Sequence, residues 1–299
     1  MSKPSFLAAA ALLATSGLHA ETLYALTTDN RLITLDTASP ALGSAVALSG
    51  LADTERLLGL DARPSNGMLY TLSNQGNIYT LNASTGAATF VTALRTPIGS
   101  NLIGFDFNPN ADLTLNASLR IITSSGGNFA VNVNPGASLG AVTAQTAITS
   151  VSNSGQALRL SGVAYTNNDT DPNTPTVLYG IDTNSSALYA TSAPAGGAYT
   201  LVGALGASSL NVFGFDVSGR TGVAYAGLTG DDSYSSLYAI NLQTGSATLL
   251  GAFGIQGNTA LPTIVGLTAA AAVPEPTSLA LSVAGLALLG GWMRRRRRA

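Results

Sequence analysis

One short glycine-centred phrase recurs along the chain and restricts its fold more than any other feature. The phrase combines apolar residues, a glycine, a further apolar residue and a short residue that is often aspartate. It occurs as LLGLDA (57–62), LIGFDF (102–107), LSGVAY (160–165), VFGFDV (212–217) and TIVGLT (263–268). Its glycines are spaced by 45, 58, 52 and 52 residues: Gly59, Gly104, Gly162, Gly214 and Gly266. A period in this range is typical of the blades of a β-propeller.

Each of the first four phrases is followed by three strand-like segments, for example MLYTLS, NIYTLN and ATFVTAL (68–94). These segments alternate at period two, and the gaps between them are rich in turn residues. The fifth phrase has no such segments after it, whereas three of them (22–50) precede the first phrase. One strand plus three completes a blade and closes the ring, which leaves no open sheet edge. We therefore predict an all-β propeller over residues 21–272 with five four-stranded blades; six blades are the alternative, because NPNADLTLNAS (108–118) is irregular.

The repeat also resembles a known bacterial family. The segments GFDFNPNADLTLNASLRIITSSGGNFAVN (104–132), GVAYTNNDTDPNTPTVLYGIDT (162–183) and LYAINLQTGSATLLGAFG (237–254) are similar to the domain of unknown function 4394. The resemblance spans most of residues 21–268 and departs at 112–118, where this chain carries extra residues. It supports the repeat interpretation but implies no activity and no catalytic residues.

The first 20 residues, MSKPSFLAAAALLATSGLHA, have the pattern of a secretory signal peptide. Lys3 precedes an apolar stretch from Phe6 to Ala14, and small residues lead to Ala20. We expect cleavage after Ala20. The alternative is a buried N-terminal helix.

The last 27 residues combine three features that occur nowhere else in the chain. Pro274, Glu275 and Pro276 are followed by an uncharged stretch of 17 residues (277–293). As a helix this stretch would be about 25 Å long, the short end of what crosses a bilayer. Five arginines then close the chain: Arg294, Arg295, Arg296, Arg297 and Arg298. We predict a transmembrane helix whose arginines stay in the cytoplasm; the alternative is a buried helix with a basic tail.

This arrangement resembles the PEP-CTERM sorting signal of Gram-negative bacteria. The resemblance implies recognition and removal by a membrane peptidase called exosortase. It further implies export, transient insertion in the inner membrane, and a final place on the outer surface or in the extracellular matrix. Such proteins are associated with exopolysaccharide and biofilm.

Composition excludes several function classes for residues 21–273. The segment holds seven Arg against fourteen Asp and Glu, a net charge of −7, so we expect no nucleic-acid partner. It contains no His, Lys, Cys or Trp. A Ser-His-Asp or Cys-His system, a Schiff base and a zinc site with His or Cys ligands are therefore excluded. We predict that the mature chain is not an enzyme and carries no cofactor, with a bound Ca²⁺ ion as the alternative.

Three carboxylates recur at one position of the phrase: Asp61, Asp106 and Asp216. Ala164 and Thr268 occupy the equivalent positions in the other two phrases. If the phrase forms the innermost strand, these aspartates ring the central channel near one end. They could then serve as a cation, glycan or acid/base site, because a glycosidase needs only two carboxyl groups. Alternatively, they accept hydrogen bonds from backbone N–H groups at the ends of strands.

The loop NNDTDPNTPT (167–176) holds the second group of candidate ligands, Asp169, Asp171 and Asn173. Their alternation matches the first half of a calcium-binding EF-hand loop. Thr174 and Gly180 stand where that loop needs Gly and Glu, so an EF-hand is excluded. A looser Ca²⁺ site and an ordinary solvated turn remain.

Three functions follow from these observations. The first is an exported, non-enzymatic surface or matrix protein that binds polysaccharide. The second is a carboxylate-based carbohydrate-active enzyme that uses Asp61, Asp106 and Asp216. The third is a Ca²⁺-dependent adhesion module that uses Asp169 and Asp171.

Overall fold

A computed structural model describes most of the expected domain. The described residues are 20–99, 103–152, 155–168, 173–207, 211–230, 234–258 and 262–271. The predicted signal peptide, sorting motif and C-terminal helix lie outside them, apart from Ala20, and so do Asp169 and Asp171. Within these ranges no helix has the length and apolarity needed to cross a membrane.

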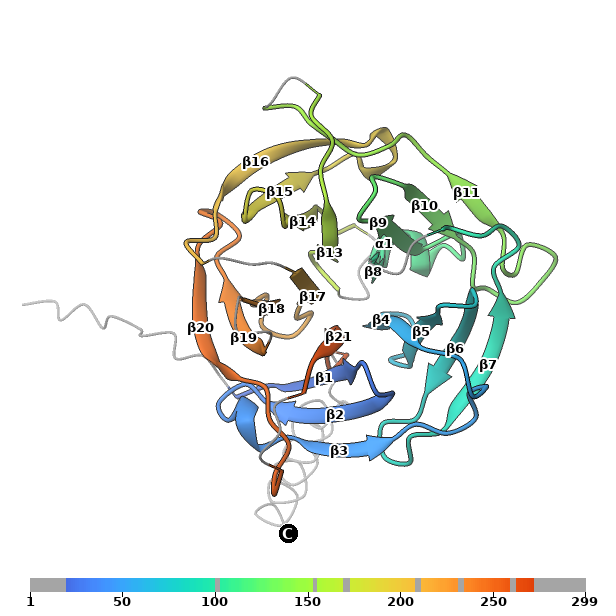
Figure 1. Ribbon diagram of the computed structural model, residues 1–299. Helices are drawn as coiled ribbons and strands as arrows, with labels where there is room; N and C mark the ends of the chain where they lie inside the picture. Colours follow the sequence, from blue (N-terminus) through green and yellow to red (C-terminus); the bar gives the residue numbers. More distant parts are fainter. Residues whose placement is uncertain are drawn as a thin grey trace, which may run out of the picture.

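Five antiparallel sheets surround a central axis, which confirms the five-bladed propeller rather than six blades (Figure 1). Blade 1 contains β21 (Ile264–Ala269), β1 (Thr22–Thr27), β2 (Arg31–Asp36) and β3 (Ser44–Ala47). Blade 2 contains β4 (Leu57–Ala62), β5 (Leu69–Ser73), β6 (Asn77–Leu81) and β7 (Ala88–Ala93). Blade 3 contains β8 (Ile103–Phe107), β9 (Leu119–Thr123), β10 (Asn128–Val131) and β11 (Val142–Ala144). Blade 4 contains β13 (Leu160–Tyr165), β14 (Leu178–Asp182), β15 (Ala187–Thr191) and β16 (Ala198–Ala204). Blade 5 contains β17 (Asn211–Val217), β18 (Ala224–Thr229), β19 (Ser235–Ile240) and β20 (Ala247–Ala252).

The ring closes in blade 1, as the number of strand-like segments at the two ends of the domain predicted. β21 pairs antiparallel with β1, and Leu23 lies opposite Ala269 in their register. The innermost strand of this blade therefore comes from the C-terminal end of the domain and the other three from its beginning. The two ends of the domain hold each other in place through backbone hydrogen bonds.

Two features were not predicted. Residues 108–118 contain a short helix, α1 (Pro109–Leu113), and the Asn108 side chain caps its first turn by accepting from the Ala111 N–H. The extra residues therefore make a helical turn and no additional strand. Blade 4 also gains a fifth strand, β12 (Thr149–Ser150), which runs parallel to β16. Two 3₁₀ turns, Pro40–Leu42 and Pro194–Gly196, complete the helical elements of the described chain.

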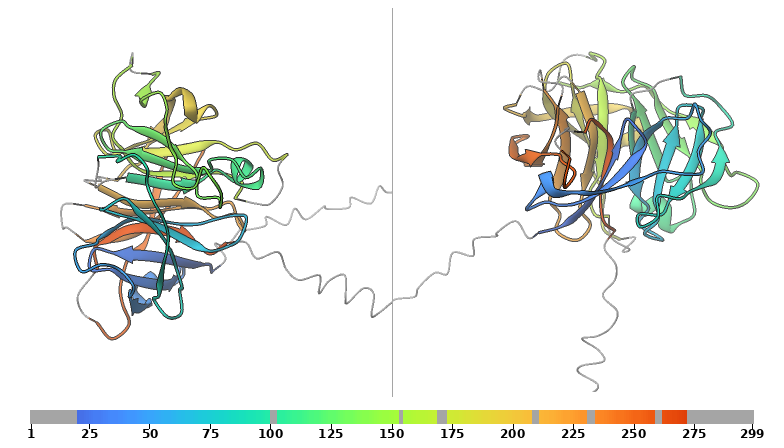
Figure 2. Two further views of the ribbon diagram at one scale, coloured as in Figure 1. Left: turned by 90° about the vertical axis from the view of Figure 1, so that its right-hand side faces the viewer. Right: turned by 60° about the horizontal axis from the view of Figure 1, so that its bottom comes forward.

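The hydrophobic core is divided among the five junctions between neighbouring blades. Between blades 4 and 5, for example, Ile181 and Leu188 pack with Phe215 and Ala226. Side chains that alternate along each strand reach the two faces of a blade in turn. Each sheet is thus covered by its neighbours, and from the side the blades form a disc (Figure 2).

The glycine of the recurring phrase allows the innermost strands to approach closely. A Cβ atom on Gly59 would lie 2.7 Å from Cβ of Phe105 in the next blade, and one on Gly104 would lie 2.7 Å from Cγ2 of Val163. Across the closure, a Cβ on Gly266 would lie 2.8 Å from Cβ of Leu60. The phrase repeats because five strands must fit around a narrow axis.

Glu55 is buried in the loop before β4 and is surrounded by hydrogen-bond donors. Its carboxylate accepts from the Tyr79 hydroxyl at 2.6 Å, the Ser73 hydroxyl at 2.7 Å, the Asn77 amide at 2.7 Å and the Ala52 N–H at 3.1 Å. Burial by itself raises the pKa of Glu55, but these hydrogen bonds outweigh it and lower the pKa to about 2. The charged form of Glu55 therefore stabilises the fold.

We expect Glu55→Gln to lower the free energy of unfolding by about 3 kcal/mol at pH 7, since a glutamine cannot accept all four bonds. Because the pKa of Glu55 is lower in the folded state, this contribution is complete above about pH 5 and is lost as the pH falls towards 2. Urea unfolding of both proteins between pH 7 and pH 2.5 checks the prediction. Asp53→Asn, an exposed neighbour, serves as the control. An equal loss at both ends of the pH range contradicts it.

Candidate functional site

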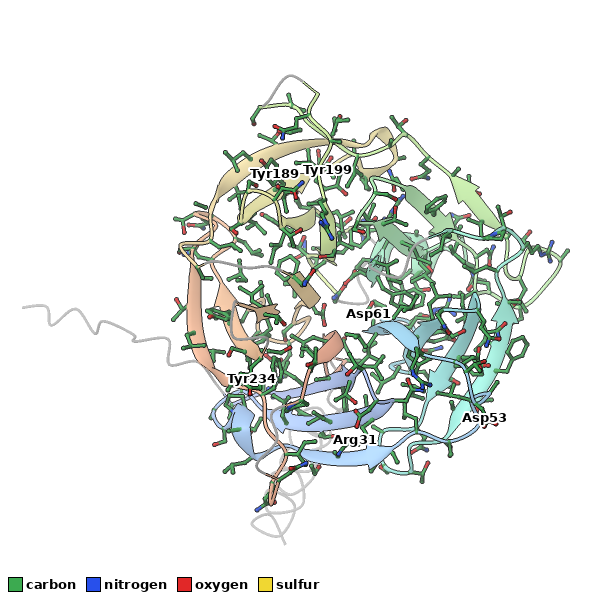
Figure 3. All side chains as sticks on the ribbon, in the orientation of Figure 1. Arg31, Asp53, Asp61, Tyr189, Tyr199 and Tyr234 are labelled. Carbon is green, nitrogen blue, oxygen red and sulfur yellow. The ribbon has the colours of Figure 1, made fainter. Side chains whose placement is uncertain are left out.

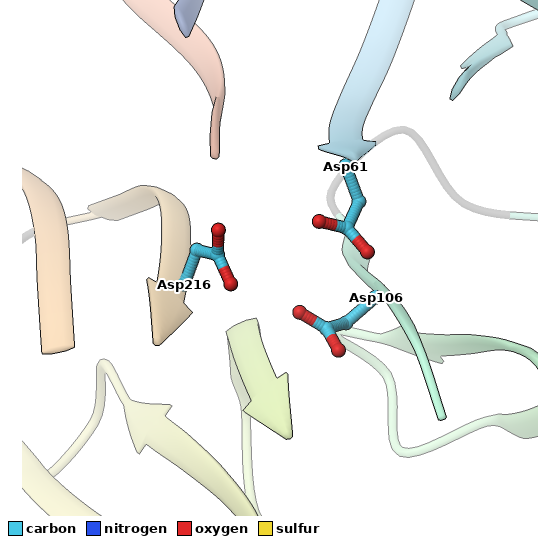
Figure 4. A group of neighbouring side chains, drawn as sticks. All are labelled: Asp61, Asp106 and Asp216. Carbon is cyan, nitrogen blue, oxygen red and sulfur yellow. The ribbon is translucent and has the colours of Figure 1, made fainter. Parts of the chain in front are cut away.

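The three aspartates of the recurring phrase meet near the axis of the propeller. Asp61, Asp106 and Asp216 are the penultimate residues of β4, β8 and β17, and these strands end at the same face of the disc. One carboxylate oxygen of each lies within 4.8 Å of the others. Figure 3 shows Asp61 beside the axis, and Figure 4 shows the three carboxyl groups converging from separate blades. We call these three residues the aspartate hub, and the face at which the innermost strands end the hub face.

The aspartate hub is buried. Asp61, Asp106 and Asp216 are 2%, 0% and 3% exposed. The sequence placed them at the mouth of a channel, and the structure puts them at that end of the axis with almost no solvent contact. The strand segments along the axis leave little free space, because glycines and apolar side chains such as Phe105, Val163 and Leu267 line it.

Hydrogen bonds from the hub join successive innermost strands. Asp61 accepts from the Phe107 N–H of the next blade at 2.8 Å, and Asp106 accepts from the Tyr165 N–H at 3.1 Å. Asp216 accepts from the Ala269 N–H at 2.7 Å. At the closure the Thr268 hydroxyl accepts from the Ala62 N–H at 3.1 Å. In each case the donor is the backbone N–H of the next blade that lies one position after the residue equivalent to the acceptor.

The junction between blades 4 and 5 differs because Ala164 has no side-chain hydrogen-bond acceptor. Here Asn168, from the loop after β13, donates to the Asp216 carboxylate at 3.3 Å and to the Val217 carbonyl at 3.0 Å. Thr268 lies between two hub residues, with its hydroxyl 3.0 Å from Asp61 and 2.9 Å from Asp216. Sequence reasoning did not assign Thr268 or Asn168 to the site; the position of Thr268 in the phrase was the available signal.

Burial raises the pKa of all three hub carboxyl groups. For Asp61 the negative charge of Asp216 raises it further, and for Asp106 the charges of Asp61 and Asp216 do so. The pKa of Asp216 is raised less strongly, because the Ala269 N–H and the Thr268 hydroxyl favour its charged form. These pKa values rise because water cannot solvate a buried carboxylate and because neighbouring negative charges repel it.

A second polar network, also missed from the sequence, joins blades 2 and 3. Arg63 follows β4 and forms a buried ion pair with Asp112 of α1 at 2.6 Å. Its guanidinium also donates to Asn134 and lies over the rings of Tyr70 and Phe107, at 5.8 and 5.6 Å from their centroids. Every group in this network has a partner, so its role is to hold the blades together.

Among the described residues the aspartate hub is the one group of three or more His, Cys, Asp or Glu side chains close enough to hold a metal ion. Of the second candidate set, only Asn173 is described, in the loop before β14. A buried group of carboxylates can bind a cation or share protons. Both would neutralise the hub.

Comparisons with known proteins show the family of the chain but no activity. No curated protein matches the sequence. Two solved structures show a weak likeness. TolB from Acinetobacter baumannii has 12% identity and a TM-score of 0.45, over 85% of this chain and 67% of that one. The dihydro-heme d1 dehydrogenase NirN in complex with DHE has 14% identity and a TM-score of 0.35. That match covers 76% of this chain and only 43% of the NirN chain. Both scores are below 0.5, so neither likeness bears on function.

Two family models match the sequence itself. Residues 272–298 match the PEP-CTERM protein-sorting motif, which confirms the resemblance of the tail and indicates export and sorting to the surface through recognition by exosortase. Residues 31–264 match the domain of unknown function DUF4394, and this match covers most of the propeller. The chain therefore belongs to the DUF4394 family and carries a PEP-CTERM sorting signal.

Proposed function

We propose that the mature chain is a non-enzymatic propeller, displayed at the cell surface, that binds extracellular polysaccharide of the biofilm matrix. The burial of the aspartate hub is the observation that supports the absence of enzyme activity in this proposal. A glycosidase needs two carboxyl groups that a sugar can reach. Asp61, Asp106 and Asp216 are at most 3% exposed, and each accepts a backbone hydrogen bond from the next blade.

The position of the chain ends supports an orientation for display. Ala270 donates its N–H to the Thr22 carbonyl at 3.0 Å, so both ends of the domain lie together at the hub face. The sorting motif begins at residue 272, directly after the described chain. While the tail is in the membrane, the hub face is thus the nearer one. The opposite face points outward, towards the matrix.

The outward face carries an open pocket of suitable chemistry. It lies at the start of β4 and beside the turn between β5 and β6, and its lining includes Leu58, Leu72, Asn74, Gln75, Pro97 and Ile98. Apolar surface beside amide side chains suits an uncharged sugar, which presents C–H groups and hydroxyls together. Asn74 and Gln75 are exposed. The Asn74 Oδ1 accepts from the Arg56 N–H and the Gln75 amide donates to the Thr54 hydroxyl, which leaves the Asn74 NH₂ group and the Gln75 Oε1 for a ligand.

Binding of the purified protein to exopolysaccharide from the producing organism tests this function. We expect retention by the wild type and a loss of at least tenfold in affinity for Gln75→Trp, because the indole fills the pocket. Gln243→Trp is the matched control: it places the same ring in an exposed loop between β19 and β20, at the hub face. Equal affinity of the two variants removes the pocket from the proposal. Release of reducing ends from the polysaccharide would favour the carbohydrate-active enzyme instead.

A further inference from the structure

The aspartate hub has too much negative charge for its surroundings. Three carboxyl groups share one small volume, and burying even one ionised carboxylate is costly unless the charge is compensated. Among the described residues no arginine forms an ion pair with Asp61, Asp106 or Asp216. Arg120 is the cross-strand partner of Asp106, but its guanidinium donates to Tyr165, Asn128 and Gln145.

One oxygen of the hub also has no hydrogen-bond donor. Asp106 is fully buried, and while its Oδ1 accepts from the Tyr165 N–H, its Oδ2 accepts from no described group. The Asp106 carboxyl group extends towards Asp61 and Asp216 (Figure 4). Asn168, which donates to Asp216, likewise has a buried Oδ1 without a partner. Buried carboxylate and amide oxygens are normally satisfied, so these atoms indicate a missing positive or donating group.

We propose that the aspartate hub binds one divalent cation of the size of Ca²⁺, coordinated by carboxylate oxygens of Asp61, Asp106 and Asp216. Ca²⁺–oxygen bonds are about 2.3–2.6 Å long, so ligands on opposite sides of the ion lie up to about 5 Å apart. The separation of the hub oxygens, within 4.8 Å, fits this limit. Oδ2 of Asp61 accepts one hydrogen bond, from the Phe107 N–H, and Oδ1 of Asp216 accepts one, from the Asn168 amide, so each keeps a second lone pair for the metal.

Such an ion joins three blades at the axis of the ring. Its ligands come from β4, β8 and β17, which are far apart in sequence and not paired in one sheet. A ligand of this kind binds the closed ring and not the unfolded chain, so it stabilises the closed propeller. None of the three proposed ligands belongs to the loop at residues 167–176, although Asn168 of that loop donates to the Asp216 carboxylate. The proposed ion does not depend on polysaccharide binding.

The test uses the full chain, purified in detergent, freed of metal with a chelator and dialysed against Ca²⁺ or Mg²⁺. We expect one Ca²⁺ per chain by elemental analysis. We also expect a melting temperature about 5–10 °C higher at a hundredfold excess over Kd than with chelator. Less than 0.1 ion per chain in millimolar Ca²⁺, with an unchanged melting temperature, overturns the proposal and leaves protons as the neutralising species.

Substitutions in the hub and outside it test where the ion binds. Asp106→Asn keeps the shape of the side chain and removes its charge, so we expect loss of the bound Ca²⁺ and of the melting shift. Asp53→Asn, an exposed carboxylate outside the hub, should keep both. If Asp106→Asn does not fold, the ion content of the wild type and of Asp169→Asn decides the question. Retention of Ca²⁺ in Asp106→Asn, or its loss in Asp169→Asn, overturns the assignment to the hub.

Discussion

Replacing Gly214 by alanine is expected to destabilise the propeller by about 3–5 kcal/mol, enough to remove a large part of the stability of an ordinary domain. Two effects add. The φ angle of Gly214 is +113°, which L side chains rarely adopt, and that strain costs about 1–3 kcal/mol. In addition, the new Cβ would lie 2.3 Å from the backbone N of Leu267 in the neighbouring blade, so the two strands must move apart. Thermal unfolding of wild type and variant measures the effect, and we expect a decrease of roughly 10 °C in the melting temperature.

Two other glycines separate these contributions. Gly222 also has a positive φ, +70°, but nothing lies within 4 Å of its added Cβ, so Gly222→Ala reports the backbone strain alone. Gly196 has open space and an ordinary φ, and we expect Gly196→Ala to change the stability by less than about 0.5 kcal/mol. If Gly214→Ala costs no more than Gly222→Ala, close packing of the innermost strands is not the reason for the recurring glycine.

Removing β21 is expected to have the largest effect of all. A chain that stops after residue 262 loses the innermost strand of blade 1, with the buried side chains of Ile264 and Leu267. Burial of each such side chain contributes about 1.5–3 kcal/mol. The hydrogen bond from the Ala269 N–H to Asp216 is lost as well, and β1 becomes an open edge. We expect no cooperative unfolding transition and aggregation at micromolar concentration, measured by calorimetry and light scattering.

The control for this truncation is a chain that stops after Ala271. It keeps β21 and the hydrogen bond from Ala270 to Thr22, and it lacks the whole sorting motif. We expect its melting temperature to match that of the full chain within about 2 °C. A cooperative transition at the same temperature in the shorter chain would show that closure by β21 is dispensable.

The strand pattern could be predicted because each blade repeats the same local requirements. Period-two alternation and turn residues mark the strands of every unit. The unequal count of segments at the two ends, none after the last phrase and three before the first, was enough to predict the closure of blade 1. The helix α1 could not be predicted, because Asn108 and Pro109 are also common in turns. What fixes the helix is the ion pair that Asp112 forms with Arg63 from another blade.

The candidate site was only partly predictable. The recurrence of Asp61, Asp106 and Asp216 showed that they are equivalent, and equivalent positions of a ring must lie around its axis. Their exposure and their partners could not be read in the same way. Each carboxylate bonds to a residue about 45 to 60 positions further along the chain, and the Ala62 N–H reaches Thr268 across 206 positions.

The sequence by itself determined the repeat, the way the ring closes and the presence of a sorting signal, because these depend on local patterns and on contiguous motifs. The choice of five blades over six came from the structure. The tertiary structure alone decided that three aspartates share one buried volume, that Asp106 keeps an unpaired oxygen there, and that both ends of the domain lie at the hub face. These properties arise where separate blades meet. The free energy of a carboxylate depends on the water, charges and donors around it, and here all of those are supplied by distant parts of the chain.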